Sequence, residues 1–67
     1  MNAGAAQQAL MALQTMAYAL IEMEAMKAEN MQREANGLAM AYDSSDFMNV
    51  AETMIQQSRN YIEWVKS

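Results

Sequence analysis

Residues 39–52, AMAYDSSDFMNVAE, place four turn-forming residues between two apolar runs, and this stretch decides the fold. Asp43, Ser44, Ser45 and Asp46 all favour helix N-caps and turns, because their short polar side chains hydrogen-bond nearby backbone N–H groups. An acid in the first turn also suits the positive end of a helix dipole. The sequence therefore predicts a polar turn at these four positions (43–46), from which a second helix starts.

The sequence after this turn predicts an amphipathic helix over about residues 46–66. Its apolar positions recur at spacings of three and four, which is typical of a helix packed along one face. The stripe comprises Phe47, Val50, Ala51, Met54, Ser58, Tyr61, Ile62 and Val65. Lys66 in the last turn suits the negative end of the helix dipole.

The sequence before the turn predicts a longer helix, over about residues 5–36, since most residues there are good helix formers and the chain has no proline. One apolar stripe comprises Ala9, Leu13, Met16, Leu20, Met23, Met31 and Leu38. We find no heptad repeat sustained over three or four repeats, so a long regular coiled coil is not expected. Asn36 and Gly37 tolerate left-handed backbone geometry, so residues 37–42 form either a kink or a short extra turn, and Gly37 either ends or bends the helix.

The first helix is apolar on more than one side, because Met11, Tyr18, Ile21 and Met26 lie off its stripe. A helix that is apolar on most sides is usually buried on more than one side, and one neighbouring helix cannot cover it. Together with Trp64 on the flank of the second helix, these residues are our candidates for binding a partner. We expect an antiparallel all-α hairpin that packs as an oligomer or against a helical partner protein.

The composition excludes several classes of function. The single domain of residues 1–67 has neither cysteine nor histidine, which removes disulfides, thiolate metal sites and Ser-His or Cys-His catalysis. We therefore expect a non-catalytic protein without a cofactor or metal. Its four cations are scattered and its net charge is −4, so neither nucleic acid nor a membrane is an expected partner. Nine methionines serve either as flexible core filler or as an adaptable recognition surface.

Two functions remain open. The first is a protein–protein interaction or assembly module that acts through the Met- and Ala-rich surface of the first helix. In size, helicity and polar turn alone, the chain is similar to bacterial type III secretion needle subunits and their small co-chaperones, which implies a subunit or co-chaperone of a larger complex. The second is a virus-encoded acidic inhibitor of a host enzyme or defence complex. The N-terminus lacks the basic region of a signal peptide, which favours the cytoplasm, with export without a cleaved signal as the alternative.

Overall fold

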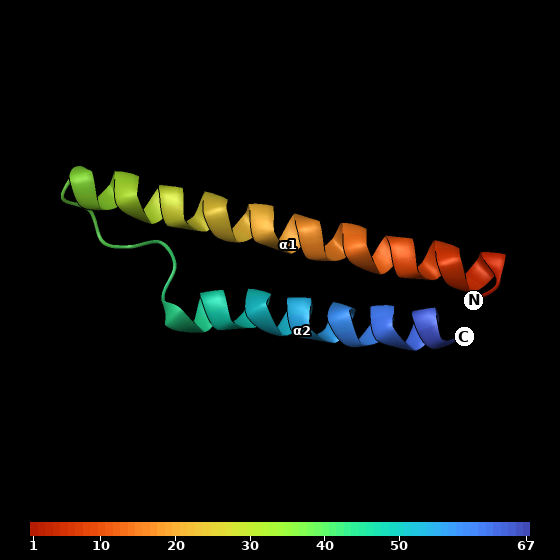
Figure 1. Cartoon of the computed structure of the whole chain (residues 1–67). Helices are drawn as coiled ribbons and strands as arrows, with labels where there is room; N and C mark the ends of the chain where they lie inside the picture. Colours follow the sequence, from red (N-terminus) through yellow and green to blue (C-terminus); the bar gives the residue numbers. More distant parts are fainter.

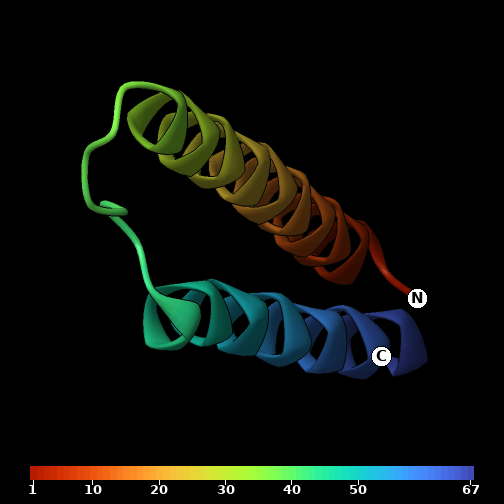
Figure 2. The same cartoon turned by 90° about the vertical axis from the view of Figure 1, so that its left-hand side faces the viewer.

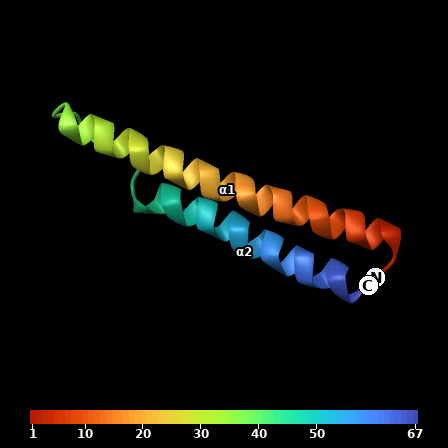
Figure 3. The ribbon, with the colours of Figure 1, turned by 45° about the horizontal axis from the view of Figure 1, so that its top comes forward.

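The computed structural model describes all 67 residues as two antiparallel helices joined by one connection (Figure 1). Helix α1 runs from Ala3 to Ala35 and helix α2 from Ser44 to Lys66. The two termini lie at the same end, and α1 extends past the start of α2 at the other end (Figures 1 and 3). The all-α helical hairpin predicted from the sequence is confirmed.

Both ends of α1 are closed by local hydrogen bonds. At its start, the Ala5 backbone N–H donates to the side-chain oxygen of Asn2 at 2.7 Å. At its end, Gly37 adopts a φ of 71°, and the Leu38 N–H donates to the Arg33 carbonyl at 2.8 Å. This six-to-one bond beyond a left-handed glycine is the Schellman motif, which satisfies carbonyls that the helix leaves free. Gly37 therefore ends the first helix instead of bending it.

The start of α2 is a reciprocal capping box. The Asp46 N–H donates to Asp43 Oδ1 at 3.1 Å, and the Asp43 N–H donates to Asp46 Oδ2 at 2.9 Å. The Ser45 hydroxyl adds a third bond to Asp43 Oδ1, at 2.8 Å. Because Asp43 is the N-cap, Ser44 is already helical, and α2 begins earlier than the start predicted at about residue 46.

The connection between the helices is held against α1 by one side chain. The side-chain oxygen of Asn30 accepts the N–H groups of Ala41 and Tyr42, each at 3.0 Å. Its amide nitrogen donates to the Tyr42 carbonyl at 2.8 Å. Residues 38–42 are not helical, so they neither continue α1 nor form a helical turn of their own.

Alanine is the commonest residue on the face of α1 that packs on α2. Its buried and half-buried positions are Ala5, Ala9, Ala12, Met16, Ala19, Met23, Met26, Asn30 and Arg33. We call this set the alanine seam. Its spacings alternate between four and three over four heptads, so the expectation of no sustained heptad repeat is wrong. The repeat is difficult to recognise in the sequence, because alanine is only weakly apolar and Asn30 and Arg33 are polar.

The partner side of the seam comes from α2. Val50 is buried and forms the centre of the core with Ala19 and Met26, while Phe47 and Met54 pack against this cluster. The small side chains of the seam allow the helix axes to approach closely. No hydrogen bond or ion pair joins α1 to α2 directly, so apolar packing holds the two helices together.

Four residues of the stripe predicted for the first helix lie elsewhere. Leu13, Leu20, Met31 and Leu38 are exposed, Leu20 by 53%. The apolar sector of α1 is wider than one helix can cover, and α2 packs on its small residues instead of its leucines. In α2 the predicted stripe faces α1 from Phe47 to Tyr61, whereas Ile62 and Val65 are exposed.

The hairpin is a single layer. Its Cα atoms span 53 × 16 × 9 Å, which is the width of two helices and the thickness of one. Figure 2, turned by 90°, shows no third element over the pair. Only 6 of 67 residues are buried, whereas domains are normally built from at least two packed layers around a core. Both broad sides of the layer are therefore open surfaces.

Candidate protein-binding surface

The two broad sides of the hairpin are separated by the alanine seam. Met11 and Leu13 flank the buried Ala12, and neighbouring residues of an α-helix point about 100° apart, so they face opposite sides. In α2, Asn60 and Ile62 flank the half-buried Tyr61 in the same way. Each side therefore takes residues from both helices.

One broad side carries large aliphatic residues from both helices. Its members are Ala6, Leu10, Leu13, Ala17, Leu20, Ile21, Met48, Ile55, Ile62 and Val65. We call this surface the apolar face. Near the termini it is hollowed by a shallow groove whose lining is entirely apolar and includes Leu10 and Leu13 from α1 and Tyr61 and Val65 from α2. The groove shows that the two helices contribute to one continuous surface.

The apolar face is free of charge along most of α1. The chain has no charged side chain before Glu22, and the first ion pair of α1 joins Lys27 to Glu24 at 3.3 Å. Both members of this pair are largely exposed, so it contributes little to stability. It marks the place where the surface changes from aliphatic to charged.

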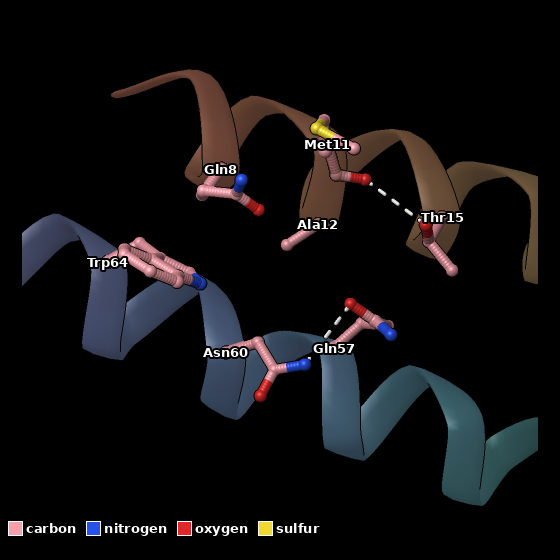
Figure 4. A pocket seen from close by; sticks show the side chains of 7 residues that line it. All are labelled: Gln8, Met11, Ala12, Thr15, Gln57, Asn60 and Trp64. Carbon is pink, nitrogen blue, oxygen red and sulfur yellow. Dashed lines mark hydrogen bonds between the residues drawn. The ribbon is translucent and has the colours of Figure 1, made fainter. Parts of the chain in front are cut away.

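The opposite side is a groove whose lining includes three side-chain amides (Figure 4). Its lining residues are Gln8, Met11, Ala12, Thr15, Gln57, Asn60 and Trp64. The polar groups bond within their own helices: the Thr15 hydroxyl donates to the Met11 carbonyl at 3.1 Å, and Asn60 Nδ2 donates to Gln57 Oε1 at 3.4 Å. We call this surface the amide groove. Trp64 on α2 and Met11 on α1 are its large apolar residues.

The five residues predicted to bind a partner are distributed over three places. Met11 and Trp64 both line the amide groove, and Tyr18, 77% exposed, lies one heptad beyond Met11 on the same side of α1. Ile21 lies at the edge of the apolar face. Met26, expected off the packed face, is instead only 5% exposed. Since it occupies a seam position against Val50, it belongs to the core.

Most of the apolar face escapes prediction from the sequence, because hydropathy alone assigns Leu13 and Leu20 to the core. A second repeat was present as a signal. On α1, the residues Ala6, Leu10, Leu13, Ala17 and Leu20 are spaced by four and three, each one position after a seam residue. On α2, the exposed Met48, Ile55 and Ile62 are seven residues apart, each one position after a residue that faces α1. A helix with two adjacent repeats of this kind contacts two neighbours.

One carboxyl group of the hairpin, that of Asp43, has a shifted pKa. Hydrogen bonds from the Ser45 hydroxyl and the Asp46 N–H hold the pKa of Asp43 below its usual 3.8, which is the signature of a cap. Arg33 pairs with Glu29 at 2.9 Å within α1. No three potential metal-ligating side chains lie together. The arrangement supports binding through apolar contact.

Neither helix combines the length and the hydropathy that crossing a membrane requires. Comparison of the chain with protein-family models, with curated proteins and with solved structures found no match.

Proposed function

We propose that the protein is a non-catalytic protein–protein interaction module and that the apolar face is its binding surface. The observation that carries this proposal is the gathering of exposed leucine and isoleucine from both helices on one side of a single layer. Contiguous exposed apolar surface is uncommon on proteins that act alone, and it marks interaction sites. The module would serve as a subunit or assembly component of a larger complex.

The chemistry of the face defines the kind of contact. Leu13, Leu20 and Ile62 present branched aliphatic side chains without a polar handle, so binding comes from burial of apolar area. An apolar helix or helix pair from a partner is the shape that fits such a surface, because aliphatic ridges of helices interdigitate.

A photo-cross-linking amino acid tests this proposal in the cells that produce the protein. Placed at Leu13 on the apolar face, it should form a covalent adduct with another polypeptide. Placed at Gln56, exposed on the outer side of α2, it should form little or none. Equal yields at the two positions, or no adduct from Leu13, would reject the apolar face as the binding surface.

Added salt separates this proposal from the acidic inhibitor. The motivation for an inhibitor is the net charge of −4, and two of the eight acids are already paired with cations in their own helix. An electrostatic contact between exposed charges weakens as salt screens it, whereas an apolar contact persists. The Leu13 adduct should therefore form equally well at low and at high salt.

A further inference from the structure

We infer that the apolar face binds a second copy of this chain, so that two hairpins form a two-fold symmetric four-helix bundle. This inference rests on the proposed function and names the partner. The contact would be isologous, since the same face serves both copies.

The helix pattern is that of a four-helix bundle. Such a bundle needs each helix to contact two neighbours through adjacent apolar repeats. α1 carries the alanine seam and, one residue further along the chain, the repeat that includes Leu13 and Leu20. α2 packs on the seam through Val50 and Met54 and carries beside them the exposed Ile55 and Ile62. Within a single hairpin, each helix packs through only one of its repeats. A second hairpin supplies a neighbouring helix for the other repeat of each.

The exposed area has the size that a dimer needs. The chain exposes 5043 Å². A folded monomer of 7.5 kDa is expected to expose about 4,250 Å², which leaves an excess of about 800 Å². That excess equals the roughly 800 Å² that each partner contributes to an interface of standard size.

The core of one hairpin is small, so a hairpin without a partner is only marginally stable and association would add to its stability. Four of its six buried residues are alanines, and none of the six is a leucine or isoleucine. Chains of this length need a disulfide, a metal, association or exceptional packing, and this chain has no cysteine. Leu10, Leu13, Leu20 and Ile62, which could form a larger core, lie instead exposed on the apolar face.

The apolar face is also complementary to itself. It presents aliphatic residues from both helices and no charge on α1 between Ala6 and Leu20. On α2, Glu52 and Arg59 border the face beside Ile55. The Glu24–Lys27 pair lies where the repeat of α1 continues toward the connection, and it limits the contact to the half of the hairpin near the termini.

Sedimentation of the purified full chain tests the inference. Between about 1 µM and 1 mM, the wild type should shift from the 7.5 kDa monomer to twice that mass or be dimeric throughout. Leu20→Asp should weaken the dimer by about 100-fold or more, because symmetry places two carboxylates in each interface. Tyr18→Asp is the matched control, since Tyr18 is exposed near the middle of α1 on the other side, and this variant should dimerise like the wild type.

Helicity measured by circular dichroism shows whether each variant folds, and the conservative Leu20→Ala provides a second test if Leu20→Asp unfolds. A wild type that remains a monomer at about 1 mM would overturn the dimer. In that case a Leu13 adduct with a different polypeptide would still support an interaction module, and the absence of any adduct would reject both proposals. If Tyr18→Asp weakened the dimer as much as Leu20→Asp does, the apolar face would not be the dimer interface.

Discussion

Two faces of α1 are both apolar, yet they differ in the size of their side chains and in what covers them. The alanine seam is small and is buried against α2, whereas the apolar face next to it is large and exposed. Large side chains gain more from leaving water than alanine does. The hairpin thus buries the alanine seam, which gains less from leaving water. It keeps exposed the apolar face, which would gain more.

This difference shows which task each face serves. Small residues let two helices lie close together, so the seam determines how the hairpin closes. Large branched residues provide the area that holds separate molecules together, so in the proposed dimer the apolar face would determine whether hairpins associate. Charged substitutions at neighbouring residues of the two faces should therefore give different kinds of damage.

The largest expected effect comes from a charge in the seam. Ala19→Asp should cost about 3 to 5 kcal/mol of unfolding free energy, the range for a buried charge without a partner, and should abolish cooperative melting. Leu20→Asp, one residue away, should leave a hairpin whose melting temperature no longer depends on protein concentration. The wild type should melt at higher temperature as its concentration rises, because association stabilises the folded state.

Thermal melts of the three proteins over a range of concentrations check this contrast. Cooperative melting of Ala19→Asp, or the same concentration dependence in Leu20→Asp and the wild type, would contradict the division of α1 into a closing face and an associating face.

The next effect concerns Asn30, the polar residue near the end of the seam. Asn30→Ala extends the run of small residues in the seam. If only the size of the side chain mattered at position 30, this change would leave the unfolding free energy unaltered. We expect instead a loss of about 1 to 2 kcal/mol of unfolding free energy, since three hydrogen bonds to Ala41 and Tyr42 disappear.

Urea unfolding measures this loss, with Asn49→Ala as the control. Asn49 is exposed and its side chain makes no hydrogen bond within the chain, so its replacement should change the unfolding free energy by less than about 0.5 kcal/mol. Equal losses for the two variants would mean that Asn30 does not hold the connection.

Some features could be predicted from the sequence because they depend on local chemistry. The helical hairpin and the position of the turn follow from helix-forming residues around an Asp-Ser-Ser-Asp stretch, and Gly37 was recognised as a stop or kink. These features depend on side chains acting on the backbone a few residues away.

The choice of packed face could not be predicted in the same way. A stripe drawn through Leu13 and Leu20 is more apolar than one through Ala12 and Ala19, and hydropathy alone selects the former. Which stripe packs depends on how closely the second helix approaches, and that is a property of two helices together. The bonds of Asn30 to the connection also join residues about one dozen apart, which no local pattern reveals.

The smallest effect is expected at the start of α2. The position of this start determines which residues of α2 pack on the alanine seam. The Ser45 hydroxyl first, and then the Asp46 N–H, lower the pKa of Asp43 below 3.8. A pKa lower in the folded than in the unfolded chain adds stability above about pH 3.8, and this stability is lost as the pH falls through the folded value. Asp43→Asn keeps the capping oxygen without the charge, so wild type and variant should differ at pH 7 and converge in acid.

Unfolding measured from pH 7 to pH 2 checks this expectation, and NMR titration of the Asp43 carboxyl gives its pKa directly. Ser45→Ala removes the strongest of the bonds that lower the pKa of Asp43, so that pKa should rise toward 3.8. If the gap between wild type and Asp43→Asn were constant with pH, the cap would act through its shape alone. The negative charge of Asp43 would then make no contribution to the start of α2.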